Sequence, residues 1–361
     1  MGKQILFLTG ATGVVGRALL EELARDYSVV CLNHRAAVDD QRVRTVSGDL
    51  TEPDFGLPRA DFRQLARGTD VVLHCAASTR WNISRDVLFR VNVDGTRQVV
   101  DFAAQADAVL YHVSTAFVAS HDYVAGDDFV AGGGEDGQRG SGPMAYVASK
   151  AAAEEVVSGS GLPAVTLRPS VFIGASRDGR IAAFQGIHKV AGLMLKDSLP
   201  VLPADPANLI DFIPQDVAAK AVRRLLERQV SEGTYWLTAG EHAATVADLV
   251  QVTLDLAAAL GVPAHSPRLM PASAVGRLLL PLLDDVMSPS LRRQFRLQLD
   301  LLHLFQSSGP LPSSLRDLGI QVTRDSQLDA FRRSAEYWAF MKGLGGAPRD
   351  HRAADQRLVA S

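Results

Sequence analysis

The sequence predicts an α/β fold of the Rossmann type, a doubly wound parallel sheet joined to a smaller, mainly helical C-terminal part that binds substrate. Apolar, strand-like runs alternate with helical patterns through the first two-thirds of the chain, which is typical of a parallel sheet. A glycine-rich turn follows the first of these runs. With 361 residues, 47% of them hydrophobic and 21% charged, the chain is long enough for one large domain and a smaller one.

The strands and helices are expected in a regular order. The first apolar run, at 5–8, is followed by helical spacing at 17–24 and by a second buried run at 29–32. Later strands are expected at 44–47, 71–74, 109–113 and 164–168, and helices near 86–105 and 144–158. After Pro169 the pattern becomes irregular, and a helix at 217–229 and a strand at 235–237 would return to the sheet.

These elements predict two domains. Residues 1–170 would form the nucleotide-binding domain, with its sheet completed by parts of 210–240. Residues 171–209 and 241–361 would bind substrate, with a proline-broken loop near 200–206. Beyond Pro263 a leucine-rich pattern favours a packed helical cap over a membrane-surface element. The glycine-rich, acidic segment at 126–143 is either a disordered loop or a lid over the site.

Composition excludes several classes of function. The formal net charge of -3 supplies no general attraction to nucleic acid or to an anionic membrane. Cys31 and Cys75 lie in apolar runs, which predicts buried thiols rather than a disulfide or metal ligands. No metal-ligand spacing is seen, so His74 and His112 are expected to be hydrogen-bonded strand residues. The sequence pattern shows no leader or membrane span, and a cytoplasmic protein is expected.

The turn after the first strand is typical of a dinucleotide phosphate cradle. Gly10 would allow the tight turn, Gly13 would let the backbone approach the pyrophosphate, and Gly16 would let the next helix pack closely on the sheet. The anion would then lie on free N–H groups at the positive end of that helix. The cofactor-binding residues predicted beside the glycines are Thr12, Val14 and Val15.

After the glycine-rich turn, a tyrosine and a lysine are the second indication of function. Tyr146 and Lys150 are four residues apart in a helical pattern and so share one helix face. A nearby ammonium favours phenolate, which predicts a lowered pKa for Tyr146 and easy proton exchange with a substrate oxygen. Lys150 could also hold the ribose of a cofactor. Ser114 and Thr115 close a strand at the ligand edge of the sheet, and Asn92 would have a structural role or relay protons between Lys150 and solvent through water.

Together these residues resemble the extended short-chain dehydrogenase/reductases over about residues 3–240. The resemblance implies a catalytic triad of Thr115, Tyr146 and Lys150, with Ser114 as a substitute for Thr115. It also implies a set of cofactor-lining residues: Asp49 and Leu50 at the adenine, Ala76 and Ala77 beside the glycine loop, and Pro169 and Val171 near the nicotinamide.

Within that superfamily, four stretches are most similar to the fatty acyl-CoA reductase and thioester reductase group, which has the male sterility-type NAD-binding domain. They lie at 72–81, 89–96, 112–117 and 210–217. Members of this group reduce acyl thioesters, held on coenzyme A or a carrier protein, to aldehydes or alcohols. The resemblance therefore implies a reductase of a small-molecule or thioester-bound acyl substrate, with a carrier protein acting in trans. A homodimer is a further expectation.

NADPH is the expected cofactor, with NADH as the alternative. A carboxylate at the end of the second strand would hold the ribose 2′-hydroxyl of NAD, but Asn33, His34 and Arg35 stand there instead. Arg35 could pair with a 2′-phosphate, helped by Arg42 or Arg44.

Other functions remain open at this point. The same triad could serve a ketone or alcohol oxidoreductase acting on a steroid-like or polyketide-derived molecule. A non-catalytic NAD(P)-binding sensor would keep the glycine loop, but retention of Thr115, Tyr146 and Lys150 favours an enzyme. A sugar-nucleotide epimerase or dehydratase is less expected, because no further acid or base stands out beside Tyr146.

Overall fold

The computed structural model describes residues 2–34, 38–80, 83–119, 142–271, 274–275, 288, 302 and 304–344. The chain forms two compact units. The first comprises Met1–Ser170, Ala218–Leu237 and Ser313–Leu318, and the second comprises Val171–Val217, Thr238–Pro312 and Gly319–Ser361. Most of the segment expected as a lid, up to residue 141, and most of the leucine-rich C-terminal pattern lie outside the described residues.

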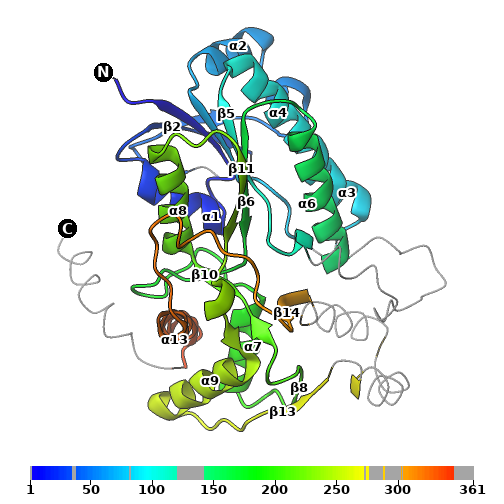
Figure 1. Cartoon of the computed structure of the whole chain (residues 1–361), viewed down its shortest axis with the longest axis vertical. Coiled ribbons are helices and arrows are strands. Elements are labelled where there is room, and N and C mark those ends of the chain that lie inside the picture. The colour runs from blue at the N-terminus through cyan, green and yellow to red at the C-terminus, as the bar shows by residue number, and fades with distance from the viewer. Residues whose placement is uncertain are drawn as a thin grey trace. The chain divides into compact units, whose positions relative to one another are not determined.

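The first unit is built on a seven-stranded sheet in the order β11-β6-β5-β4-β1-β2-β3 (Figure 1). Every neighbouring pair is parallel. The strands are β1 (Ile5–Thr9), β2 (Ser28–Asn33), β3 (Arg44–Ser47), β4 (Val71–His74), β5 (Val109–Val113), β6 (Ala164–Pro169) and β11 (Gly233–Leu237). The predicted Rossmann-type parallel sheet is therefore confirmed, and each predicted strand of this unit is present.

Helices cover both faces of this sheet (Figure 1). On one face lie α1 (Val14–Leu23) and α8 (Gln215–Glu227), which are joined by an ion pair between Arg223 and Glu22. On the other face lie α2 (Arg59–Arg67), α3 (Arg85–Phe89), α4 (Gly95–Ala106) and α6 (Pro143–Ser158). Because both faces are covered, the central strands β1, β2, β4 and β5 are largely buried on both sides and have the near-continuous apolar sequences that made them predictable.

The helix expected at 86–105 is interrupted. A π-helical turn, Arg90–Asp94, separates α3 from α4 and turns the Asn92 side chain into the interior. The Thr96 hydroxyl donates to the Asn92 carbonyl oxygen at 2.6 Å. Such side-chain bonds to the helix backbone, and single π turns at functional sites, leave no trace in hydrophobic periodicity.

An aromatic cluster fixes the helices of the second face to the sheet. Phe7 on β1 and Phe102 on α4 lie with ring centroids 4.4 Å apart, Phe55 stacks on Phe7, and Phe62 packs edge-on to Phe55 and Phe102. All four rings are buried. Burying a side chain of this size stabilises the folded state by about 1.5–3 kcal/mol.

Within its described residues, the second unit combines short strands with the helices α7 (Gly186–Leu195), α9 (Val246–Leu260) and α13 (Arg324–Met341). The short strands are β7 (Val171–Ile173), β8 (Val201–Pro203), β9 (Leu209–Ile210), β10 (Phe212–Pro214), β12 (Ala244–Thr245), β13 (Arg268–Met270) and β14 (Gln306–Ser307). The expectation of a loop near 200–206 and of helix beyond Pro263 was incomplete, because β8 pairs with β13. Two three-residue segments so distant in sequence carry no local pattern that reveals their pairing.

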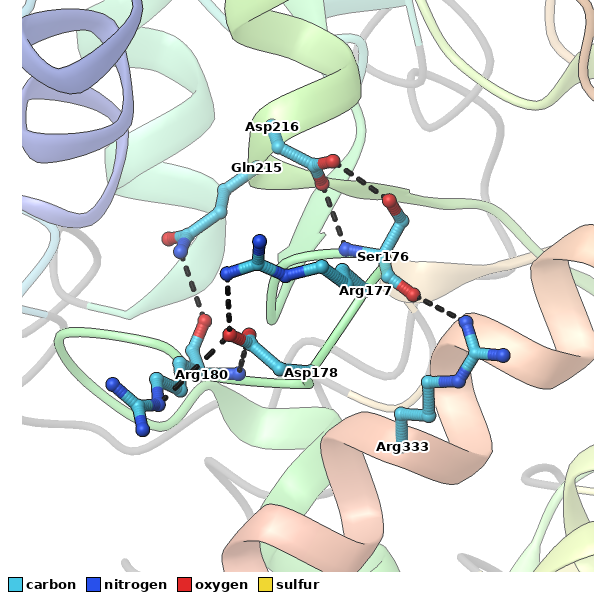
Figure 2. A network of polar contacts seen from close by, with 7 residues as sticks. All are labelled: Ser176, Arg177, Asp178, Arg180, Gln215, Asp216 and Arg333. Atoms are coloured by element: carbon cyan, nitrogen blue, oxygen red, sulfur yellow. Dashed lines mark hydrogen bonds and ion pairs between the residues drawn. The ribbon is translucent and has the colours of Figure 1, made fainter. Parts of the chain in front are cut away.

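A network of polar contacts holds the loop after β7, as Figure 2 shows. Asp216 accepts hydrogen bonds from the backbone N–H and the hydroxyl of Ser176, at 2.8 and 2.7 Å. On the other side, the Arg333 guanidinium donates to the Ser176 carbonyl oxygen at 2.6 Å. Gly179 has φ of 70°, and a Cβ there would overlap the Arg333 carbonyl, so this turn requires glycine. The stretch 210–217 thus supplies the carboxylate that anchors the loop.

No helix within the described residues is both long enough and apolar enough to cross a membrane. In the same part of the chain, no three His, Cys, Asp or Glu side chains are grouped as metal ligands.

Candidate active site

The carboxyl ends of β1 and β4 define the centre of the site. The chain runs from β1 to β2 and β3 on one side and then crosses to β4 on the other, so these ends form the topological switch point of the sheet. Ligands of doubly wound folds bind at this place. The loop 10–16 follows β1 and the segment 75–78 follows β4, so both predicted cofactor-lining segments lie there.

The three glycines of the loop have distinct spatial roles. Gly10 has φ of 73°, and a Cβ there would lie 2.6 Å from the Ala76 backbone nitrogen. A Cβ on Gly16 would overlap the Gly10 carbonyl oxygen, so this glycine allows α1 to pack against the loop. A Cβ on Gly13 would meet only the Gly10 carbonyl oxygen, at 3.3 Å, and otherwise open space. Among the described residues no side chain caps α1, which begins at Val14, so the N–H groups of its first turn have no side-chain acceptor there. The loop therefore fits a dinucleotide pyrophosphate.

Polar atoms at the strand ends give independent support for a ligand. Asn33 Oδ1 at the end of β2, Ser114 Oγ after β5 and Ser170 Oγ after β6 are buried and have no hydrogen-bond partner within the described part of the chain. Buried polar groups are normally paired, and all three lie at the carboxyl edge. Asn33 occupies the position that contacts the cofactor ribose in Rossmann folds. Sequence reasoning did not select Asn33 or Ser170 as ligand contacts, although the place of each after an apolar strand was a usable signal.

The adenine end of the predicted site contains a histidine and a carboxylate. Asp49 Oδ2 lies 3.2 Å from His34 Nε2, and Asp49 Oδ1 accepts hydrogen bonds from the backbone and hydroxyl of Thr51. Leu50 packs against the aromatic cluster. These contacts fix the segment after β3 beside the end of β2.

The structure does not place Arg42 or Arg44 where the cofactor phosphate was expected. Arg44 begins β3 and pairs with Val30, three positions before the carboxyl end of β2, and Arg42 precedes it. Arg42 also forms a two-pronged ion pair with Asp40, at 2.6 Å. Both arginines therefore lie toward the amino end of these strands, and their expected help to Arg35 stays a prediction. Arg35 itself lies outside the described residues.

Helix α6 brings the predicted triad residues to the end of β5. Lys150 is 3% exposed, and its Nζ donates to the Val113 carbonyl oxygen at 2.6 Å. Ser114 and Thr115 follow directly and are buried. Tyr146 lies one turn before Lys150 on α6. The structure therefore anchors the tyrosine-bearing helix beside the predicted hydroxyl residues and leaves two Lys150 protons for other acceptors.

Burial controls the proton affinity of this site. Desolvation raises the pKa of Tyr146 to about 12. Desolvation also lowers the pKa of Lys150 to about 8, against the opposing effects of Cys75 and Glu154. The predicted lowering of the Tyr146 pKa by the ammonium was therefore wrong for the protein alone, because loss of water around the phenol outweighs the lysine. Tyr146 is consequently a protonated phenol at neutral pH, which is the state that a proton donor needs.

Asn92 joins the segment after β4 to α6. Its amide Nδ2 donates to the Ser78 carbonyl oxygen at 3.1 Å and to Ser149 Oγ at 2.9 Å, and its Oδ1 accepts from the Ser78 N–H at 2.7 Å. Both amide protons are thus occupied. This geometry supports the structural role of Asn92 and leaves no amide donor for a water relay to Lys150.

The two histidines under the site differ from each other. His74 is hydrogen-bonded through both ring nitrogens. His112, on the neighbouring strand, is fully buried, and neither of its ring nitrogens has a hydrogen-bond partner in the described residues. The expectation of a satisfied strand histidine therefore holds for His74 and not for His112. The two cysteines are free thiols, and Cys31 is buried as expected.

Acid should destabilise the protein through its buried histidines. Desolvation lowers the pKa of His74 to about 3 and of His188 on α7 to about 4, and it also lowers that of His112. Below the ordinary histidine pKa the unfolded chain binds protons that the folded chain does not. The free energy of unfolding should therefore be highest above pH 6.5 and fall by up to about 1.4 kcal/mol per pH unit for each histidine below it.

Urea unfolding between pH 7.5 and pH 5 measures this slope. Replacing the exposed His242 by glutamine is the matched control and should leave the slope unchanged. A free energy of unfolding that stays constant over this range would contradict the account of the buried imidazoles.

The comparisons with known proteins agree with this geometry. A family model described as male sterility protein matches residues 32–222, more than half of the chain. A hybrid PKS-NRPS synthetase of Talaromyces variabilis is 28% identical over 239 residues, which are 63% of this chain and 6% of the synthetase. Fatty acyl-CoA reductase 2 of Bos taurus is 29% identical over 147 residues, which are 32% of this chain and 28% of that protein. The chain thus spans a small part of the length of these relatives.

Solved structures show the same fold. The terminal R domain from the myxalamid PKS-NRPS biosynthetic pathway superposes with a TM-score of 0.65, covering 97% of this chain and 93% of that one at 22% sequence identity.

Proposed function

The chain belongs to the male sterility protein family, and on that premise we propose that this NAD(P)-dependent oxidoreductase uses NADPH to reduce an acyl thioester. The acyl group would be held on coenzyme A or on a carrier protein acting in trans. One observation carries the proposal furthest: Tyr146, kept protonated by burial, lies on a helix anchored at the same sheet edge as the glycine cradle.

Each triad residue has a defined task in this proposal. The cofactor, when bound, supplies a hydride to the carbonyl carbon. Tyr146 donates its proton to the carbonyl oxygen as negative charge develops there, and Thr115 stabilises the same oxygen with its hydroxyl. Lys150, fixed by the Val113 carbonyl, holds the ribose hydroxyls with its remaining protons. The resulting hemithioacetal collapses to an aldehyde and a free thiol.

The choice of NADPH rests on the end of β2. Asn33 and His34 stand where a carboxylate would bind the ribose of NAD and repel a 2′-phosphate, and the Asp49 carboxylate nearby faces His34. Arg35 follows directly in the sequence as a partner for the phosphate.

A matched substrate panel tests the proposal. The purified protein is given NADPH or NADH with an acyl-CoA, the corresponding N-acetylcysteamine thioester, and a ketone of the same carbon skeleton. We expect thioester-dependent oxidation of NADPH, faster than that of NADH, with aldehyde or alcohol as product. Turnover of the ketone alone would instead support the ketone or alcohol oxidoreductase, and binding of NADPH with no turnover would support a sensor.

A further inference from the structure

A network of hydrogen-bonded, buried polar side chains lies beneath the glycine loop. His74 ends β4 and is paired with Thr9, which ends β1. His74 Nδ1 lies 2.7 Å from Thr9 Oγ1, and His74 Nε2 lies 3.1 Å from Thr96 Oγ1. His74 is 1% exposed and both threonines are 0% exposed. The three side chains can therefore be satisfied only by one another and by nearby backbone groups.

The direction of every hydrogen bond in this network follows from Thr96. Its hydroxyl has one proton, which it donates to the Asn92 carbonyl oxygen at 2.6 Å. Thr96 Oγ1 can then only accept from His74, so the proton of the neutral imidazole lies on Nε2. Nδ1 is left as an acceptor, and the Thr9 hydroxyl must donate to it. Thr9 Oγ1 in turn accepts from the Ala76 backbone N–H at 3.2 Å.

The surroundings keep His74 neutral. The His112 ring lies beside that of His74, with ring centroids 5.4 Å apart. Desolvation lowers the His74 pKa to about 3, and the charge of Lys150 acts in the same direction. A second ring proton, on Nδ1, would also break the bond from Thr9. The single tautomer is therefore maintained across the whole neutral pH range.

The two ends of this network reach both cofactor-lining segments and helix α6. Thr9 immediately precedes Gly10, and its hydroxyl holds the N–H of Ala76. At the other end, Asn92 holds Ser78 and, through Ser149, helix α6. We propose that His74, as the Nε2–H tautomer, is a positioning residue that fixes the glycine loop and the segment 75–78 for cofactor binding, in a role that rests on the NAD(P) cofactor of the proposed function.

Paired threonine variants test this role. Thr9→Val keeps the shape of the side chain but removes the proton that Nδ1 needs, whereas Thr9→Ser retains it. We expect the dissociation constant of NADPH to rise about tenfold in Thr9→Val and to return close to the wild-type value in Thr9→Ser. The effect should fall on cofactor affinity, with a smaller change in kcat at saturating cofactor. Equal dissociation constants for the two variants would overturn the proposal.

The tautomer is tested in the unmodified protein, which avoids any dependence on the folding of a variant. Nitrogen-15 NMR of the histidine side chains should show His74 as neutral Nε2–H between pH 8 and pH 5, with His74→Asn identifying the signal. An Nδ1–H tautomer, or an imidazole that titrates in this range, would overturn the proposal. The NADPH titration and the NMR measurement need no acyl substrate, so a failure of the thioester reductase proposal would leave these two results readable.

Discussion

Replacement of Tyr146 by phenylalanine should lower kcat for thioester reduction by about 10²–10⁴-fold, the usual contribution of a positioned general acid. The phenol is the group that burial keeps protonated, with a pKa of about 12, and phenylalanine fills the same space without the proton. The dissociation constant of the cofactor should stay unchanged, because the substitution leaves the glycine loop intact. Steady-state kinetics and a fluorescence titration with NADPH measure the two quantities.

Tyr235→Phe is the matched control, since Tyr235 lies on the edge strand β11. It should retain wild-type kcat. The pH profile gives a second check: because the pKa of Lys150 is lowered to about 8, reduction should decline above that pH as Lys150 loses its proton. A Tyr146→Phe enzyme with wild-type kcat would show that another group supplies the proton.

Gly13→Ala should weaken NADPH binding by about tenfold or more while changing thermal stability far less than Gly16→Ala does. Gly13 has φ of -75° and ψ of 172°, which alanine adopts without strain, and the new Cβ would meet only the Gly10 carbonyl oxygen. The methyl group would instead occupy the space into which the pyrophosphate must approach. Thermal unfolding and NADPH titration of the same preparation separate the two effects.

Gly16→Ala is the contrasting variant. Its Cβ would overlap the Gly10 carbonyl within the protein itself, so the melting temperature should fall even without cofactor. If Gly13→Ala bound NADPH as tightly as the wild type, the loop would not be the phosphate cradle.

The sheet was largely predictable because its central strands are buried on both faces and its strands alternate regularly with helices along the chain. The runs at 44–47, 71–74 and 109–113 coincide with β3, β4 and β5 at both ends. The π turn Arg90–Asp94, where the Thr96 hydroxyl donates to the Asn92 carbonyl oxygen, was not predictable, since hydrophobic periodicity carries no trace of such a turn. The pairing of β8 with β13 depends on tertiary contacts, which outweigh the proline-rich local pattern.

The parts of the candidate site that depend on the spacing of residues in a motif were predictable. The properties that depend on burial from solvent, such as the pKa of a side chain, were not. The glycine loop and the Tyr146–Lys150 pair follow from short-range spacing, and the structure brings both to one sheet edge. The direction of the Tyr146 pKa shift required knowledge of burial, which spacing does not provide. Asn33 and Ser170 became visible only as buried polar atoms without partners among the described residues.

The most direct test of thioester reduction follows the hydride and the thiol together. The protein is supplied with NADPH deuterated at the transferable position of the nicotinamide C4 and with an acyl-CoA, and released coenzyme A is titrated while the product is analysed by mass spectrometry. Thioester reduction should place deuterium on the former carbonyl carbon and release one free thiol for each acyl group reduced, with both signals lost in Tyr146→Phe. A product without deuterium, or oxidation of NADPH with no release of thiol, would contradict thioester reduction.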